Sequence, residues 1–276
     1  MKVHRLTGSI GAMLELDLGS SDAVPAVRSA LATHCVIVLR GKFMTPDDLV
    51  RFGRRFGSLV MTIGTEKELN ANDKGLTSHD AHENVLRVRN MGKAQAVTEN
   101  WHADNIFSKN PTAISILAAE ALPEVGGDTM FSNQFLAYET LSTGMKRLLR
   151  GARMKHTAAA VPAYRDMAPD AAPHAVHPIV PLHREAQRPY LLIGGRAAPH
   201  RLFLDMTLQE SSGLHNYLFE HSVQPDRVYR HKWEAGDVVI WDNRATMHYA
   251  IHDYGDAVRD MNRVTIGGEA PIPYDE

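Results

Sequence analysis

The sequence has little cysteine and no long apolar segment, and each absence excludes a class of protein. Cys35 is the single cysteine, so no disulfide can form within the chain, which suits a reducing compartment. No segment approaches the ~18 consecutive apolar residues of a membrane-spanning helix, and the first residues lack the apolar stretch of a secretory signal. We therefore expect a cytoplasmic protein that does not enter a membrane.

Net charge is also nearly absent. The 276 residues include 30 basic and 32 acidic side chains, which gives a formal net charge of −2, and the sequence pI is about 6.7. Proteins that bind nucleic acid across a wide surface are usually basic, so nucleic acid is not expected as a partner. The chain is long enough to bury about three quarters of its extended surface in a core.

Histidine, by contrast, is abundant, with 15 residues. A metal site needs only two or three histidines, so most must have other roles. We expect exposed or structural positions for His79, His82, His174, His177, His183 and His252.

Strand-like and helix-like segments follow one another without regular alternation, which favours a mainly antiparallel β fold with flanking helices. Segments typical of strands are 33–41, 85–91, 113–123, 188–195, 228–233, 236–243 and 263–268. Segments typical of helices are 45–57, 133–152 and 207–222. No repeat, low-complexity tract or linker divides the chain, so residues 1–276 are predicted to form a single domain.

Two long segments fit neither period. Residues 62–84 are polar and aperiodic, which predicts a loop that covers an active site. Residues 157–189 are rich in alanine, proline and histidine, which predicts an excursion over the surface. The helix predicted over 45–57, in contrast, has a capping residue in Thr45 and an apolar face for packing on the sheet.

The stretch "NWHADN" places His102 and Asp104 two residues apart. In an extended segment such side chains emerge on the same face, so an imidazole and a carboxylate would lie side by side. This arrangement can hold a cation, but in isolation it is more often a hydrogen-bonded structural pair.

Further along the chain, His248 follows an apolar strand and an Asp-Asn turn, which places it at a strand edge. Arg259 and Arg263 are four residues apart, so in an extended segment they share one face. Two guanidinium groups in apolar surroundings require an anion nearby. Two histidines and one carboxylate are the ligand set of non-heme iron(II) oxygenases, which leaves coordination positions open.

Five features together resemble the taurine dioxygenase-like family of iron(II)/2-oxoglutarate dioxygenases, which includes 2,4-dichlorophenoxyacetate dioxygenases and alkylsulfatases. They are the arginine pair and the stretches "NWHADNIFSKNP", "LPEVGGDTMFS", "AYETLS" and "GDVVIWDNRATMHYA". The resemblance extends over residues 35–272 and implies a double-stranded β-helix, the jelly roll of cupin-like proteins.

The resemblance also implies roles for individual residues. His102, Asp104 and His248 would bind iron(II), while Arg259 and Thr129 would hold the distal carboxylate of 2-oxoglutarate. Molecular oxygen would be the second co-substrate, and succinate and CO2 would be products.

Three further residues are implied at the substrate pocket. Arg263 would face the anionic group of the substrate, Phe107 would line the pocket, and Asn105 would present its main-chain amide. The family resemblance implies a small anionic substrate, namely a sulfonate, alkyl sulfate, aryloxyalkanoate or amino-acid-like acid, and a homo-oligomer, a dimer or tetramer.

Departures from the family pattern concern the substrate and the reaction. The histidine and tyrosine that precede the H-x-D motif in taurine enzymes have no counterparts, because His79 and His82 fall at other positions. Taurine is therefore not the expected substrate. Asp104 is retained, which argues against the related halogenases. The alternatives are a biosynthetic oxygenase that hydroxylates or desaturates an amino-acid-derived metabolite, a non-catalytic sensor of metal and 2-oxoglutarate, and a zinc hydrolase.

Overall fold

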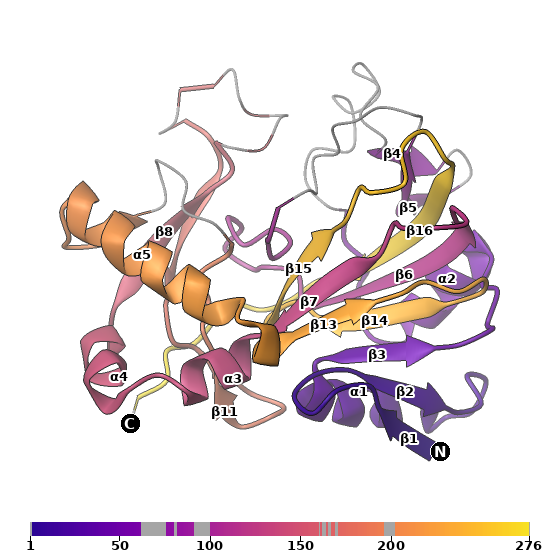
Figure 1. Cartoon of the computed structure of the whole chain (residues 1–276), viewed down its shortest axis with the longest axis horizontal. Helices are drawn as coiled ribbons and strands as arrows, with labels where there is room; N and C mark the ends of the chain where they lie inside the picture. Colours follow the sequence, from indigo (N-terminus) through magenta and orange to yellow (C-terminus); the bar gives the residue numbers. More distant parts are fainter. Residues whose placement is uncertain are drawn as a thin grey trace.

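A sheet of eight strands forms the centre of the molecule (Figure 1). The computed structural model describes residues 2–61, 76–79, 82–90, 100–159, 161, 164, 167–168, 171–195 and 202–275. In spatial order the strands are β1 (Lys2–Arg5), β2 (Ala12–Glu15), β3 (Val36–Leu39), β14 (Val238–Asp242), β6 (Ile114–Ala121), β16 (Arg259–Ile266), β5 (His82–Asn90) and β4 (Leu76–His79). Only β2 and β3 are parallel neighbours within it, so the predicted mainly antiparallel sheet is confirmed.

A second sheet of three strands packs on one face of the large sheet. Its order is β13 (Val228–His231), β7 (Thr129–Asn133) and β15 (Thr246–Ala250). Apolar side chains of both sheets form one buried cluster, in which the ring of Phe131 lies 5.5 Å from that of Trp241 between centroids. The functional residues described below lie between these two sheets.

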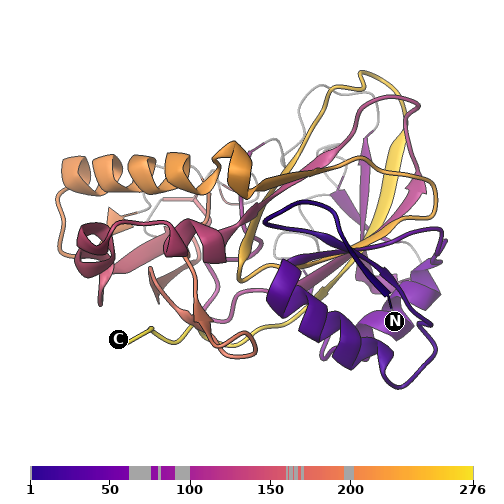
Figure 2. The ribbon, with the colours of Figure 1, turned by 60° about the horizontal axis from the view of Figure 1, so that its bottom comes forward.

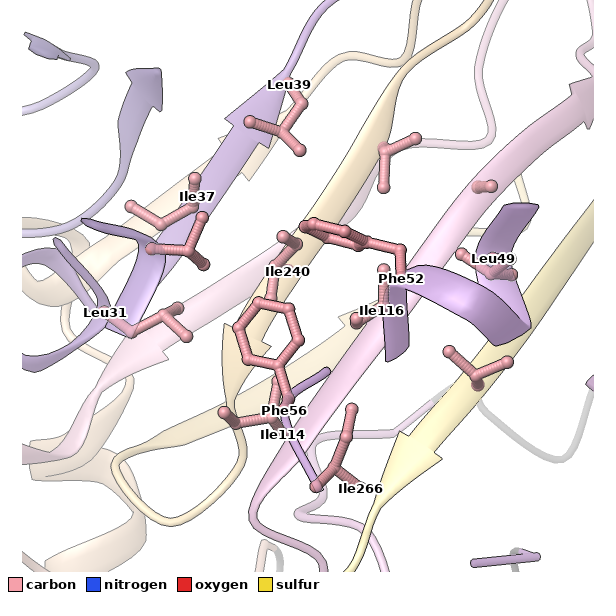
Figure 3. Packing of buried hydrophobic residues seen from close by; sticks show 14 of the residues in the cluster. Leu31, Ile37, Leu39, Leu49, Phe52, Phe56, Ile114, Ile116, Ile240 and Ile266 are labelled. Carbon is pink, nitrogen blue, oxygen red and sulfur yellow. The ribbon is translucent and has the colours of Figure 1, made fainter. Parts of the chain in front are cut away.

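Helices α1 (Ala23–His34) and α2 (Pro46–Arg54) cover the other face of the large sheet (Figures 2 and 3). Ile114 and Ile116 of β6 point toward the helices, whereas Leu117 belongs to the cluster between the sheets. This alternation is the period of two that a strand buried on both faces requires. The strand predicted over 113–123 and its inward face are therefore confirmed.

The N-terminus of α2 is fixed by local chemistry. The Thr45 side chain accepts a hydrogen bond from the Asp48 backbone N–H, and the Asp48 carboxylate accepts one from the Thr45 N–H. This reciprocal capping box satisfies two of the backbone donors that begin a helix. The helix predicted over 45–57 is confirmed, although it ends at Arg54.

A lobe beside the two sheets contains the remaining elements (Figure 2). They are α3 (Gln134–Glu139), α4 (Thr143–Leu149), α5 (Leu208–Ser222), the 3-10 helix η2 (Pro225–Arg227), the strands β12 (Leu202–Phe203), β8 (Arg153–Thr157) and β9 (His174–Pro178) of one sheet, and the hairpin β10 (Leu182–His183) and β11 (Arg188–Pro189). None of the helices in the described part of the chain combines the length and the apolar composition needed to cross a membrane.

Two sequence predictions in this lobe are wrong in detail. The helix predicted over 133–152 is two helices, because the Ser142 side chain accepts a hydrogen bond from the Met145 N–H and begins a new one. The strand predicted over 188–195 stops at Pro189. The N–H groups of Tyr190 and Leu192 donate to the carbonyls of Pro181 and Ile179, whereas the N–H of Leu191 donates to that of Gln134 in a second segment, and the strand assignment does not continue.

The two long irregular segments also need correction. The surface excursion predicted over 157–189 contains β9 and buries Ile179 and Val180 in the core of the lobe. Within the loop predicted over 62–84, residues 76–79 and 82–84 belong to β4 and β5. A polar strand at a sheet edge lacks the apolar pattern that identifies strands in sequence. The rest of that prediction lies outside the described residues.

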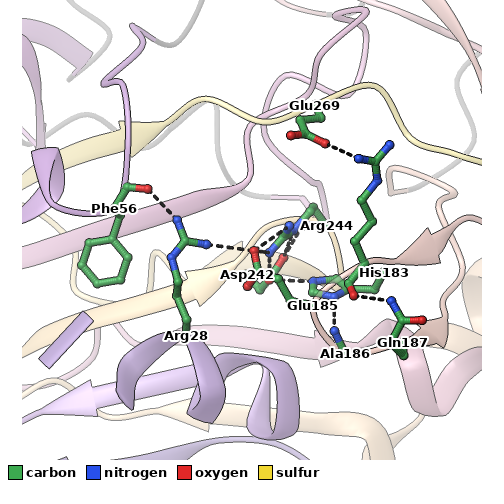
Figure 4. A network of polar contacts seen from close by, with 10 residues as sticks. Arg28, Phe56, His183, Glu185, Ala186, Gln187, Asp242, Arg244 and Glu269 are labelled. Carbon is green, nitrogen blue, oxygen red and sulfur yellow. Dashed lines mark hydrogen bonds and ion pairs between the residues drawn. The ribbon is translucent and has the colours of Figure 1, made fainter. Parts of the chain in front are cut away.

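A polar network joins α1, the β10–β11 hairpin and the end of β14 (Figure 4). Asp242 is buried and accepts hydrogen bonds from Arg244, while His183 Nε2 lies 2.9 Å from Asp242 Oδ2. Glu185 Oε1 lies 2.8 Å from Arg28 Nη1 and 3.4 Å from Arg244 Nη1. Glu185 therefore links α1 to the turn that precedes β15.

Replacing Glu185 by alanine is expected to lower the free energy of unfolding by about 1 kcal/mol, because two arginines lose a shared, partly exposed partner. Urea unfolding monitored by circular dichroism measures this change. Glu269→Ala is the matched control: Glu269 pairs with Arg184, both are largely exposed, and its loss is expected to cost less than ~0.5 kcal/mol. Equal losses in the two variants would contradict the linking role.

Candidate metal centre

Backbone hydrogen bonds bring together two histidines from distant parts of the sequence. His102 forms an isolated antiparallel bridge with His248 of β15. The His102 N–H donates to the His248 carbonyl at 3.0 Å, and the His248 N–H donates to the His102 carbonyl at 2.8 Å. The two imidazole rings consequently lie with their centroids 4.1 Å apart.

Asp104 completes a group of three possible metal ligands. Its Oδ1 atom lies 3.8 Å from Nε2 of His102 and 3.8 Å from Nε2 of His248. One ligand atom from each of the three side chains lies within 4.8 Å of the others, and this is the only such group of three or more found in the described residues. Two imidazoles and one carboxylate at this spacing fit an iron(II) ion bound on one face.

The protonation of these groups also suits a metal. Nδ1 of His102 lies 2.8 Å from the Asn100 carbonyl, which can only accept, so Nδ1 carries the proton and Nε2 keeps its lone pair. Burial and the neighbouring His102 lower the pKa of His248 well below its usual value. Burial alone would raise the pKa of Asp104, but Arg263 and both histidines outweigh it and lower that pKa.

Asn243 fixes the backbone of the loop that carries Asp104. The Asp104 N–H donates to Asn243 Oδ1 at 3.2 Å, and Asn243 Nδ2 donates to the Asp104 carbonyl at 3.0 Å. Asn243 Oδ1 also lies 3.3 Å from Trp241 Nε1. The side chain thus acts as a clamp on Asp104, a role that the sequence analysis missed because it read Asn243 only as a turn residue.

Arg263 lies against the carboxylate of Asp104. Its Nη1 atom is 3.2 Å from both oxygens of Asp104, and the Arg263 side chain is almost wholly buried. Ser115 Oγ donates to Asp104 Oδ2 at 3.0 Å. The sequence predicts an anion near Arg263, and the Asp104 carboxylate is such an anion. Contact of Arg263 with a substrate stays a prediction.

A second cationic position lies at the end of the inter-sheet space. Arg259 of β16 is 4% exposed, and its Nε donates to the Gly127 carbonyl at 3.0 Å. Its Nη2 lies 3.4 Å from Thr129 Oγ1, and its guanidinium carbon lies 5.7 Å from the Trp233 ring centroid. Within the described residues, no aspartate or glutamate forms an ion pair with Arg259. Burial lowers its pKa.

Thr129 accepts from two donors. Trp233 Nε1 donates to Thr129 Oγ1 at 3.0 Å, in addition to the contact from Arg259. A hydroxyl oxygen has two acceptor positions and one proton, so the Thr129 proton remains to be donated. The ring of the buried His231 packs edge-on against Trp233. Its two ring nitrogens contact the Tyr229 hydroxyl and the Asp237 carboxylate, which fixes the end of β13. A carboxylate beside Thr129 and Arg259 would meet donors from both.

Gly127 makes this approach possible. It has a φ of +74°, and a Cβ atom there would lie 3.1 Å from Cδ of Arg259. A side chain would be strained in this conformation and would crowd the guanidinium. The turn at Gly126-Gly127-Asp128 therefore determines how closely the backbone can approach Arg259.

The two remaining predicted residues lie in the same loop as Asp104. Asn105 is buried with a φ of +53°, and its Nδ2 donates to Thr112 Oγ1 at 3.2 Å. Phe107 is buried, with its ring 6.5 Å from that of Tyr164 between centroids. Their roles toward a substrate stay predictions.

Acidification is expected to destabilise the metal-free protein. Burial lowers the pKa of His177, His231 and His248 in the folded state, whereas an unfolded histidine has a pKa of about 6.5. The unfolded chain therefore binds more protons below about pH 7, and the free energy of unfolding falls as the pH decreases from there. Urea unfolding at pH 7, 6 and 5 measures the slope, which His177→Gln should reduce. A stability that is constant or rises would contradict this linkage.

Three residues that contact the predicted site residues were not predicted themselves. Ser115 and Asn243 contact Asp104, and Trp233 contacts Thr129. Ser115 had a weak signal, since it is a single hydroxyl within an apolar strand. Asn243 and Trp233 were read as a turn residue and a core residue, and only long-range contacts reveal more.

Comparison with known proteins agrees with this geometry. Residues 2–265 match the family described as "Taurine catabolism dioxygenase TauD, TfdA family". An alkylsulfatase of Acinetobacter baylyi is 29% identical over 290 residues, covering 98% of this chain and 86% of that protein. A (S)-phenoxypropionate/alpha-ketoglutarate-dioxygenase of Delftia acidovorans is 30% identical over 236 residues, covering 82% of this chain and 80% of that protein.

A solved structure shows the same arrangement of elements. The crystal structure of a taurine dioxygenase from Burkholderia xenovorans superposes with a TM-score of 0.81 at 30% identity, covering 99% of this chain and 92% of that one. The predicted β-rich fold with flanking helices is confirmed by this match. The chain therefore belongs to the TauD, TfdA family of alpha-ketoglutarate-dependent dioxygenases.

Proposed function

We propose that this protein uses iron(II), 2-oxoglutarate and O2 to hydroxylate a small anionic organic molecule, with succinate and CO2 as products. The substrate classes are a sulfonate, an alkyl sulfate, an aryloxyalkanoate or an amino-acid-like acid. We further propose that the two packed sheets form a double-stranded β-helix, or jelly roll, as in cupin-like proteins. A biosynthetic oxygenase acting on an amino-acid-derived metabolite is the alternative within the same chemistry.

The observation that carries the proposal is the buried guanidinium of Arg259 on β16, the same strand whose Arg263 contacts Asp104 of the three possible metal ligands. A buried charge without a partner is costly, so a cation retained in this position favours an anionic ligand. The Thr129 hydroxyl adds a donor to the same place. A hydrolase would need the metal but would give this cation no purpose.

In this proposal each residue has a distinct role. His102, Asp104 and His248 hold iron(II), which when bound supplies the coupled activation of oxygen and decarboxylation of 2-oxoglutarate. Arg259 and Thr129 hold the distal carboxylate of that co-substrate and so orient it. Arg263, Phe107 and the main-chain amide of Asn105 contact the substrate, and the buried surroundings exclude water.

The substrate class is supported by the relatives. Their names concern sulfate esters, alkyl sulfates, phenoxypropionate and 2,4-dichlorophenoxyacetate. All of these molecules are small and anionic, which suits a site with two buried arginines. Identities of about 29% support the class and leave the individual molecule open.

Anaerobic titration of the protein with iron(II) and 2-oxoglutarate tests the proposal. The chelate of 2-oxoglutarate with iron(II) gives a weak visible charge-transfer band, which acids from the proposed classes should shift. Release of sulfite, sulfate or a phenol under oxygen would identify the first substrate classes, and a hydroxylated or desaturated product would identify the biosynthetic alternative. Absence of the band at full iron loading would contradict the 2-oxoglutarate assignment.

A non-catalytic sensor would bind the same ligands without turnover. Succinate formation with any substrate excludes that interpretation.

Three further predictions accompany the proposal, namely a single domain over residues 1–276, a cytoplasmic location and a homo-oligomer, either dimer or tetramer. Light scattering on the purified protein tests the oligomeric state directly.

A further inference from the structure

The two carboxylate oxygens of Asp104 have different surroundings. Oδ1 lies 3.8 Å from Nε2 of both His102 and His248, so it faces the possible metal position. Oδ2 accepts a hydrogen bond from Ser115 Oγ at 3.0 Å. Arg263 Nη1 is 3.2 Å from each oxygen and therefore does not distinguish them. Among the described hydrogen bonds to the carboxylate, only the one from Ser115 goes to a single oxygen.

Strand β6 determines where this hydroxyl points. Ser115 is 0% exposed and stands between Ile114 and Ile116, whose side chains pack toward helices α1 and α2. Because strand side chains alternate, Ser115 faces the other way, into the space between the two sheets. A buried hydroxyl there requires an acceptor, and the Asp104 carboxylate is the one that the fold supplies.

We propose that Ser115 is a positioning residue that holds Oδ2 and leaves Oδ1 as the single oxygen offered to the metal. This inference rests on the proposed function, because it assumes that His102, Asp104 and His248 bind iron(II). A carboxylate that turned and used both oxygens would occupy one more coordination position. The three-ligand site needs its open positions for 2-oxoglutarate and oxygen. By holding Oδ2, the serine would keep the carboxylate from occupying one of these coordination positions.

The geometry explains why a serine is needed in addition to the arginine. A guanidinium nitrogen equidistant from both oxygens attracts the carboxylate without setting its rotation. A single hydroxyl bound to one oxygen sets that rotation. Hydrogen bonds to residues that bind a metal commonly change its affinity by ~10- to 100-fold when they are removed.

Cobalt(II) binding to the full-length Ser115→Ala variant tests the inference without turnover. Cobalt(II) has visible absorption bands whose intensity depends on coordination number. We expect at least ~10-fold weaker cobalt(II) binding than in the parent, a changed band intensity before 2-oxoglutarate is added, and weaker 2-oxoglutarate binding to the cobalt form. Ser115→Thr keeps the hydroxyl and should restore the parental spectrum.

The matched control is Ser132→Ala. Ser132 is also 0% exposed, and its Oγ donates to the Ser222 carbonyl, away from the three ligands. Its variant should keep the parental cobalt affinity and spectrum. If Ser115→Ala fails to fold, Ser115→Cys, which has nearly the same shape but a weaker donor, replaces it and should show the same changes.

The outcomes separate this inference from the proposed function. A parent protein that binds neither cobalt(II) nor 2-oxoglutarate would overturn both. A parent that binds them while Ser115→Ala and Ser115→Cys keep its affinity and spectrum would overturn the positioning role alone. Equal changes in the Ser132→Ala control would assign the effect to general loosening of the sheets, which would also overturn it.

Discussion

His102→Ala is expected to weaken anaerobic iron(II) binding by more than ~100-fold, because losing a ligand should exceed the 10- to 100-fold cost of losing a residue that only supports one. The His102 side chain is 21% exposed, so its removal should leave the core intact. Isothermal titration with iron(II) under nitrogen measures the affinity. Succinate formation should be lost in the same variant.

His174→Ala is the matched control for this change. Nδ1 of His174 lies 3.0 Å from the Ala172 carbonyl, the same two-residue contact that Nδ1 of His102 makes with Asn100. His174 is exposed and lies outside the group of possible ligands. Its variant should bind iron(II) as the parent does. Unchanged iron affinity in His102→Ala would contradict the metal assignment.

Arg259→Ala is expected to raise the Kd for 2-oxoglutarate at least ~30-fold, which corresponds to the ~2 kcal/mol lower limit for truncating a buried charge pair. The metal-loaded protein under nitrogen is titrated with the co-substrate. Its free energy of unfolding should not fall greatly, since the parent buries this cation without an acidic partner in the described residues. Iron(II) affinity should be unchanged.

Two controls make this result specific. Arg230→Ala removes a half-exposed arginine that pairs with Asp128 in the same region, and it should leave 2-oxoglutarate binding unchanged. 2-Oxobutanoate has the metal-chelating end of the co-substrate but no distal carboxylate, so its affinity should be nearly the same in the parent and in Arg259→Ala. An equal loss of affinity for both acids would show that the arginine acts on the metal instead.

Local patterns were sufficient to predict most of the principal elements and to place His102 and Asp104 on one face, whereas the prediction that they bind a metal depends on the family resemblance. The capping residues of α2 act within three residues of each other, and the alternation along β6 depends only on chain direction. His102 and Asp104 are likewise neighbours in the chain. Such features are determined by nearby residues, so a sequence contains them without reference to the rest of the fold.

Features that depend on distant partners could not be predicted in this way. The spacing of Arg259 and Arg263 predicts a shared need for an anion, but the partner that each meets, the Gly127 carbonyl for Arg259 and the Asp104 carboxylate for Arg263, is more than a hundred residues away. The run at Tyr190–Ile193 has the composition of a strand, yet its N–H groups bind two separate segments, around Ile179–Pro181 and at Gln134. The helix break at Ser142 reflects competition between a capping hydroxyl and a continuous apolar face.

The backbone bridge between His102 and His248 has a consequence for synthesis of the protein. It closes a loop of 248 − 102 = 146 residues. A chain growing on the ribosome therefore lacks the complete set of candidate ligands until His248 has been made, and Arg259 emerges later still. Prematurely terminated chains would gain no stabilisation from iron, because a ligand stabilises only the state that binds it. On the proposed function, a supply of iron would protect chains that contain all three candidate ligands and leave shorter fragments open to proteolysis.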